Sequence, residues 1–327
     1  MDKLTVVLGD YPHAHALLDS GTEIDGYLVE PVEVKPVIGA YPRMIRDLEF
    51  DVCELAPVSY LMARQEGIAI TAIPVFLNRR FHHGDVQCAV NSGIRVPKDL
   101  EGRRIGVRAY SVSTGVWVRG VLRDEYGVDI DKITWVVDDD DHIEGRVPAN
   151  VERVTDGRSL GELLRAGEID AALTGNAGTG RAGAPKAGWT AAAEPEPGSD
   201  DDPYPLFPEA GTLAVDHYLR KGVYPLHSVI SMRSELVERD PDLPSKLYAA
   251  FAESKRRHLT ARPEWSAVPR LARQGQQIGG DPVPYGITAN EASLNAMVRF
   301  AKDQSLLDAD FPADLTSLFA AGDYPEA

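Results

Sequence analysis

Two separated stretches constrain the fold of this chain more than any other feature. Residues 97–107 read as a helical turn, a glycine break at Gly102 and a short apolar strand. Residues 164–173 follow the same order around Gly167. This pairing is typical of a two-lobed α/β protein at the point where the chain begins its second lobe. In such sheets ligands lie beyond the carboxyl ends of the strands, so we expect the function to reside in a cleft between the lobes.

The charge of the chain narrows the range of partners. Its 327 residues carry 34 basic and 50 acidic side chains, a net charge of −16. Nucleic acid and anionic membranes repel such a chain, so neither is an expected partner. The apolar run 4–8 is too short for the core of a signal peptide, which favours a cytoplasmic protein. Cys53 and Cys88 each lie in an apolar run and are expected to be buried, reduced thiols.

Apolar periodicity predicts alternating strands and helices, and therefore a mostly parallel sheet in each lobe. Strands are expected at 4–9, 29–34, 50–55, 70–76, 85–91, 104–107, 133–137 and 169–174. Helices are expected at 41–48, 58–65, 113–126, 160–166, 244–259, 263–274 and 289–304. Loops are expected at 175–188 and 194–208, and after Gly211 the chain should cross back through 223–232. The first lobe would comprise 1–95 and 215–327, and the second lobe 96–214.

Several stretches resemble the 4,5-dihydroxyphthalate decarboxylase family. They are residues 50–55, 73–76 with Arg79, Phe81 and His83, 106–110, and 116–128 with its run Glu125-Tyr126-Gly127. The resemblance implies a fold like that of type 2 periplasmic binding proteins, used by a cytoplasmic enzyme. It further implies decarboxylation of a dihydroxylated aromatic acid without an organic cofactor, in an assembly of identical subunits. Trp117 is expected in the core, and Arg119 in an ion pair between lobes or subunits.

The chain departs from the family at positions where arginines are expected. His13, His15 and His82 stand there instead, and the turn containing Asn176 lacks the usual arginine and proline. Titratable groups thus replace permanent cations at positions expected to face the ligand. The departures leave open which aromatic acid is bound.

Three histidines are the candidate catalytic residues: His83, His82 and His13. Loss of carbon dioxide from an aromatic acid requires a proton donor near the ring carbon and a proton acceptor near the phenol. Histidine can take either role because its pKa lies near neutral pH. The alternative is that these histidines only occupy exposed loops or pack behind the site.

Hydroxyls, cations and a helix start are the candidate contacts to substrate. Arg79, Ser59 and the helix start at Ser113 and Thr114 would hold a carboxylate. The remaining candidates for substrate binding are Tyr11, His15, Glu54, Asn176 and His227. For Ser113 and Thr114 the alternative is helix capping without a ligand, and for Glu54 it is capping or an ion pair with Arg79.

No metal site is predicted, because the alternating His13 and His15 have no nearby carboxylate or thiolate to complete a ligand set. Two other functions remain open at this point. The chain could be a solute-binding protein that captures a small acid without reaction. It could also be a lyase or dehydratase on the same scaffold.

Overall fold

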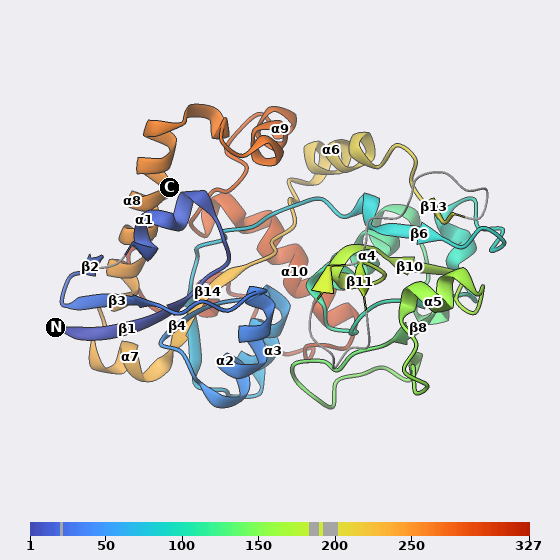
Figure 1. Cartoon of the computed structure of the whole chain (residues 1–327), viewed down its shortest axis with the longest axis horizontal. Helices are drawn as coiled ribbons and strands as arrows, with labels where there is room; N and C mark the ends of the chain where they lie inside the picture. Colours follow the sequence, from blue (N-terminus) through green and yellow to red (C-terminus); the bar gives the residue numbers. More distant parts are fainter. Residues whose placement is uncertain (20–21, 183–189, 192–201) are drawn as a thin grey trace. The chain divides into compact units, whose positions relative to one another are not determined.

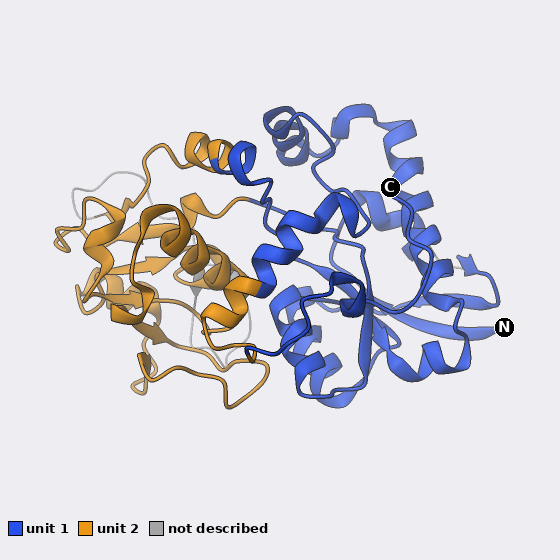
Figure 2. Cartoon of the chain, turned by 180° about the vertical axis from the view of Figure 1, so that it is seen from behind, with its two compact units in different colours: residues 1–80, 217–298, 309–327 blue, residues 81–216, 299–308 orange. Residues whose placement is uncertain are grey.

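The computed structural model describes residues 1–19, 22–182, 190–191 and 202–327. The chain divides into two compact units, each with its own six-stranded sheet (Figure 2). Unit 1 comprises Met1–Arg80, His217–Val298 and Ala309–Ala327. Unit 2 comprises Phe81–Asp216 and Arg299–Asp308.

The sheet of unit 1 has the strand order β2-β3-β1-β4-β14-β5. Its strands are β1 (Asp2–Val7), β2 (Glu23–Ile24), β3 (Tyr27–Pro31), β4 (Val52–Leu55), β5 (Ile70–Ile73) and β14 (Val229–Arg233). β1 pairs in parallel with β3 and β4, whereas β14 returns antiparallel between β4 and β5. The C-terminal ends of β1, β4 and β5 therefore lie at one edge of the sheet, together with the N-terminal end of β14.

Helices cover both faces of this sheet (Figure 1). They are α1 (His15–Leu18), α2 (Tyr41–Asp47), α3 (Pro57–Gln65), α7 (Ser234–Arg239), α8 (Leu243–Ala261) and α9 (Pro269–Ile278). On one face, Val6 and Ile230 pack with Phe251 of α8 in a single apolar cluster. α2 and α3 contact β4 and β5 on the other side. The alternation of side chains along each strand supplies apolar residues to both layers.

The sheet of unit 2 has the strand order β13-β6-β10-β7-β8-β9. Its strands are β6 (Val86–Cys88), β7 (Arg104–Gly106), β8 (Thr134–Val137), β9 (Val151–Arg153), β10 (Ala171–Leu173) and β13 (Tyr204–Pro205). β11 (Arg181–Ala182) and β12 (Thr190–Ala191) form a separate pair. The helices are α4 (Ser113–Tyr126) and α5 (Leu160–Arg165); α6 (Ala210–Lys221) begins in unit 2, and α10 (Glu291–Asp303) ends in it.

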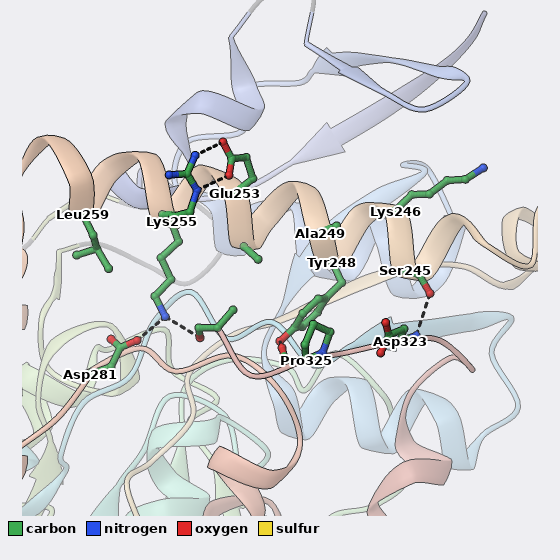
Figure 3. Close-up of a pocket in the computed structure, with 13 residues that line it drawn as sticks. Ser245, Lys246, Tyr248, Ala249, Glu253, Lys255, Leu259, Asp281, Asp323 and Pro325 are labelled. Atoms are coloured by element: carbon green, nitrogen blue, oxygen red, sulfur yellow. Dashed lines mark hydrogen bonds and ion pairs between the residues drawn. The ribbon is translucent and has the colours of Figure 1, made fainter.

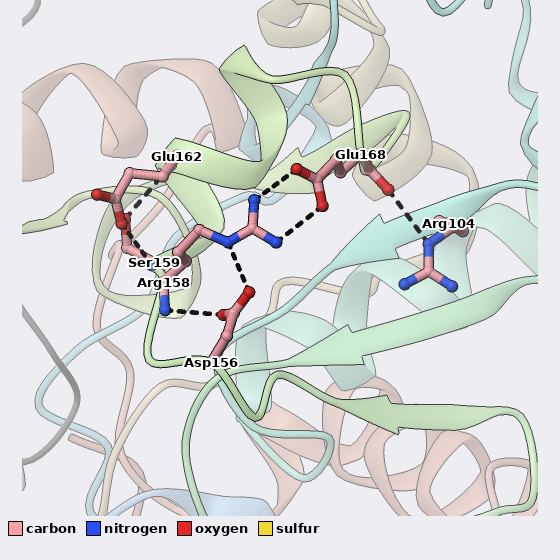
Figure 4. Close-up of polar contacts among 6 residues, drawn as sticks. All are labelled: Arg104, Asp156, Arg158, Ser159, Glu162 and Glu168. Carbon is pink, nitrogen blue, oxygen red and sulfur yellow. Dashed lines mark hydrogen bonds and ion pairs between the residues drawn. The ribbon is translucent and has the colours of Figure 1, made fainter.

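Local signals explain where these helices begin and end. Ser159 caps α5 in a reciprocal pair with Glu162, which satisfies two backbone donors at the helix start. Gly127 ends α4 with φ of 62°, a left-handed conformation that glycine adopts without strain. Beside α5, an exposed polar network links Arg158 to Asp156 and Glu168 (Figure 4).

The structure differs from the sequence predictions at several elements. α6 was not expected; its buried Ala214 and His217 are at helical spacing, but Pro208 and Gly211 nearby indicate a loop. The helix expected at 263–274 is divided into a short 3₁₀ turn, Pro263–Trp265, and α9, which begins at Pro269. A proline cannot continue the preceding helix, so α9 starts afresh. The loops expected at 175–188 and 194–208 lie partly outside the described residues.

The unit boundaries also differ from the expected lobes. Residues 81–95 cluster with unit 2, because β6 pairs with both β10 and β13. Residues 299–308 do so as well, because Phe300 and Gln304 pack against α4. Among the described residues, no helix has both the length and the apolar character needed to cross a bilayer.

Candidate active site

The predicted residues of unit 1 lie along one edge of its sheet, which we call the unit 1 edge. Six of them lie in the last residues of a strand, in the loop after it or in the helix that follows: Tyr11, His13, His15, Glu54, Ser59 and Arg79. Val229 at the start of β14 lies opposite Leu55, so His227 reaches the same edge. Its backbone N–H donates to the carbonyl of Asn78 over 2.9 Å. Sheet topology thus brings together residues far apart in the chain.

Glu54 is the polar centre of this edge. Its carboxylate accepts hydrogen bonds from the Gly9 backbone N–H at 2.8 Å, the Tyr11 hydroxyl at 2.7 Å and the Tyr41 hydroxyl at 3.4 Å. Only 1% of the residue is exposed, and burial raises its pKa, whereas these hydrogen bonds act in the opposite direction. Glu54 therefore positions the loop after β1, and its oxygens are already engaged. The alternative weighed for Glu54, an ion pair with Arg79, does not form, because Arg79 donates to Asn290, Ser293 and Tyr224.

His13 is buried in an aromatic cluster. Its ring lies 5.1 Å from that of Trp265 and 6.5 Å from that of His258. Burial lowers its pKa to about 3, and the charge of Lys255 acts in the same direction. His13 is thus a neutral imidazole at neutral pH. A proton donor needs a pKa closer to the working pH, so this environment favours a packing role for His13.

Arg79 is buried and its guanidinium is largely occupied within unit 1. It donates to Asn290 at 2.7 Å, to Ser293 at 3.1 Å and to the carbonyl of Tyr224, over whose ring it also packs. Burial lowers its pKa to about 10. A role in holding the carboxylate stays a prediction, and these contacts favour a structural role instead.

The other predicted residues of the unit 1 edge differ in exposure. His15 is exposed and contacts Asp10, with 2.6 Å between Nε2 and Oδ1. Ser59 is buried in the first turn of α3. His227 is half-buried.

The predicted residues of unit 2 lie at the corresponding edge of its own sheet, which we call the unit 2 edge. β6 runs antiparallel to β10, with Val86 opposite Leu173, so the histidines before β6 lie beside the turn after β10. The Thr174 backbone N–H donates to the carbonyl of Asp85 over 2.9 Å. This pairing brings His82 and His83 close to the turn that contains Asn176, which is itself exposed.

His82 and Asp85 form a buried pair. The Nδ1 of His82 lies 2.6 Å from Oδ2 of Asp85, and the histidine is 2% exposed. A carboxylate at this distance orients the imidazole. His83 is also buried, with its ring 5.8 Å from that of Phe207. Asp85 was missed at the sequence level, although a carboxylate three residues after His82 was a usable signal.

The start of α4 completes the unit 2 edge. Ser113 and Thr114 are both buried, and Val112 at the cap position provides no side-chain hydrogen bond. The first N–H groups of α4 are thus not capped by that residue. Ser111, which precedes them, donates to Asp141 from both its backbone and its hydroxyl.

Arg119 lies behind this helix start. It is fully buried, donates to Gln304 at 2.6 Å and to the carbonyl of Tyr110, and packs over the Tyr110 ring. Within the described residues of this single chain, Arg119 forms no ion pair, and a pair with a neighbouring subunit stays a prediction. Trp117 is fully buried, which confirms its place in the core.

Two surface depressions, a groove in unit 1 and a hollow in unit 2, contain none of the predicted site residues. A groove of about 810 Å³ runs between α8 and the segment Asp323–Ala327, with Tyr248, Leu259 and Pro325 in its wall (Figure 3). Asp156, Arg158 and Glu168, whose polar contacts are drawn in Figure 4, also line a hollow of about 180 Å³. Within the described part of the chain, no group of three or more His, Cys, Asp or Glu side chains is arranged to hold a metal ion.

Comparison with known proteins decides the family. Residues 42–175 match the family model described as NMT1/THI5 like. A 4,5-dihydroxyphthalate decarboxylase from Comamonas testosteroni is 31% identical over 314 residues, covering 88% of each chain. The chain belongs to the 4,5-dihydroxyphthalate decarboxylase family. This confirms the resemblance seen in the sequence and places the chain in a family of carboxy-lyases. The same enzyme from Pseudomonas putida is 31% identical over 52% of this chain and 69% of its own length.

A solved structure supports the fold class. The periplasmic aliphatic sulphonate binding protein SsuA from Escherichia coli matches with a TM-score of 0.50 over 98% of both chains, at 13% identity. At this identity the likeness concerns the fold alone. The predicted α/β architecture of the periplasmic-binding-protein type is confirmed.

Proposed function

We propose that this chain decarboxylates a hydroxylated aromatic carboxylic acid similar to 4,5-dihydroxyphthalate, without an organic cofactor. The observation that carries the proposal is the 31% identity to the Comamonas testosteroni decarboxylase over 88% of both chains. The buried histidines of the unit 2 edge provide chemistry that suits such a reaction.

The reaction replaces a carboxylate by a proton. A ring hydroxyl supplies electron density to the carbon that bears the carboxylate, and that carbon accepts a proton. The bond to the carboxylate then breaks, its electron pair returns to the ring, and carbon dioxide leaves. The protein must therefore donate a proton at the ring carbon and accept one near the phenol.

We assign the proton transfers to His82 and His83. The contact between His82 and Asp85 supports this role, because the carboxylate holds the other ring nitrogen in a defined direction. In this proposal Ser113 and Thr114 hold a carboxylate at the start of α4. The remaining proposed contacts are Asn176 at the unit 2 edge, and Ser59, Tyr11, His15 and His227 at the unit 1 edge.

The test is an assay of the purified chain on a panel of dihydroxylated aromatic acids, with carbon dioxide release and the ultraviolet spectrum as readouts. Asp85→Asn should lower turnover of the best substrate at least about a hundredfold, the lower end of general acid–base contributions. Asp156→Asn is the matched control, because Asp156 belongs to the exposed network of the same unit. Equal activity in the two variants would remove the buried pair from the mechanism.

The same assay separates the other two functions. A rise in melting temperature with a panel acid, without turnover, would support a solute-binding protein. Turnover without release of carbon dioxide would support a lyase or dehydratase of another kind. Either outcome would contradict the proposed decarboxylation.

A further inference from the structure

We propose that Arg270, on α9, binds a carboxylate of the substrate at the unit 1 edge. This inference rests on the proposed function for the class of substrate and adds a residue that sets its specificity. It also gives the unit 1 edge the accessible cation that the buried Arg79 does not supply.

The fold holds Arg270 at this edge through α9. The neighbouring Leu271 and Gln274 are buried, whereas Arg270 itself is exposed. Trp265, immediately before α9 along the chain, packs against the ring of His13 from the loop after β1. The helix is therefore tied to the same loops that carry the predicted site residues.

Three hydrogen bonds fix the guanidinium of Arg270 in place. Its Nη1 donates to the carbonyl of Arg79 at 2.7 Å and to Oε1 of Gln274 at 3.1 Å. Its Nη2 donates to Oδ1 of Asn78 at 3.1 Å. All three acceptors are uncharged, so the positive charge is oriented without being neutralised. Within the described residues, no carboxylate lies at ion-pair distance from Arg270.

Three other arginines of unit 1 are instead paired with carboxylates. Arg233 pairs with Asp51, and Arg256 and Arg257 both pair with Glu253. Arg270 instead combines a fixed side chain with an unpaired charge, in a chain whose net charge is −16. A held guanidinium loses less conformational freedom when it binds a carboxylate, and it can donate two parallel hydrogen bonds.

The electrostatic surroundings of Arg270 include other groups of the edge. Burial lowers the pKa of Arg270, the charge of Tyr224 acts against that shift, and the charge of Arg80 adds to it. Arg270 in turn opposes the rise in the pKa of Tyr11 that burial and Glu54 produce. Arg270, Arg80 and Tyr11 therefore belong to one electrostatic environment at the unit 1 edge. A carboxylate bound here would meet a fixed cation whose three hydrogen-bond acceptors are all uncharged.

The test compares the binding of phthalate and catechol by calorimetry. Phthalate carries two carboxylates but no ring hydroxyl, whereas catechol carries the hydroxyls without a carboxylate. Arg270→Gln should weaken phthalate binding at least about tenfold, the range of a hydrogen bond to a charged group, and leave catechol binding within about twofold. Arg270→Lys should restore part of the phthalate affinity, since it keeps the charge but not the paired donors.

Arg273→Gln is the matched control, because Arg273 is an exposed arginine on the same helix. It should leave the binding of both ligands unchanged. The proposal would be overturned by unchanged phthalate affinity in Arg270→Gln, by equal loss of both ligands, or by no phthalate binding to the unmodified chain at millimolar concentration. If the unmodified chain binds phthalate through Arg270 but releases no carbon dioxide from any panel acid, the proposed function fails and this inference stands.

Discussion

Substitution of Gly120 by alanine should destabilise unit 2. Gly120 lies inside α4, and a Cβ atom there would lie 2.1 Å from Cδ2 and 2.3 Å from Cε2 of Phe300. Phe300 is 2% exposed and packs edge-on against Trp117, with 5.8 Å between ring centroids. Because Trp117 is itself fully buried, Phe300 cannot move away without displacing a second large side chain.

Two opposing effects set the change in the free energy of unfolding caused by Gly120→Ala. Alanine inside a helix is favoured over glycine by about 1 kcal/mol. Overpacking of a dense core costs about 1–3 kcal/mol, and contacts so far inside the normal separation of roughly 3.5–4.0 Å place this case at the upper end. The net expectation is a loss of about 2 kcal/mol, roughly a thirtyfold shift toward the unfolded state.

Hydrogen exchange of peptides from α4 is the appropriate measurement, because the two units need not unfold together. Gly120→Ala should reduce protection of α4, and a second change, Phe300→Leu, should recover part of it. Gly211→Ala in α6 is the control, since no heavy atom lies within 4 Å of its added Cβ. Protection of α4 equal to that of the unmodified chain would refute the packing argument.

Two further predictions concern buried titratable groups. The folded-state pKa of His13, about 3, lies below its ordinary value, so the unfolded chain binds more protons between these two pH values. Stability should therefore fall as pH falls, by about 2 kcal/mol from this group between pH 6.5 and 5, and denaturant titrations should find that slope reduced in His13→Phe. Cys53 and Cys88 are both buried, and burial raises the pKa of Cys88 to about 12. A thiol reagent such as dithiobis(nitrobenzoate) should label neither in the native chain and both after denaturation, and rapid native labelling would contradict their burial.

Much of the fold could be predicted because its signals are local. The apolar runs at 50–55 and 70–76 predict β4 and β5, and the spacing at 113–126 predicts α4 with the observed bounds. α6 could not be predicted in the same way, because Pro208 and Gly211 indicate a loop. The helix forms because packing buries one of its faces, which includes Ala214 and His217. The division of 263–278 depends on Pro269, which begins α9 and is a local signal in the sequence.

The candidate site could be predicted only in outline. The rule that ligands lie at the carboxyl ends of strands selected a set of loops, and the pairing of β14 and β6 gathers these loops at one edge of each sheet. The state of each side chain could not be predicted. His13 and His15 are two residues apart, yet one is 1% exposed and the other is exposed to solvent.

The sequence by itself determined the alternation of strands and helices and the loops at the strand ends, because each depends on neighbouring residues. It also determined the family, because family membership follows from sequence similarity. Only the tertiary structure decided that Arg79 is buried whereas Arg270 keeps an exposed charge. Arg79 is enclosed by Asn290 and Ser293, and Arg270 is held by the carbonyl of Arg79 from 191 positions away. Burial and hydrogen bonding of a charge are set by contacts between distant segments, and no local pattern in the chain encodes them.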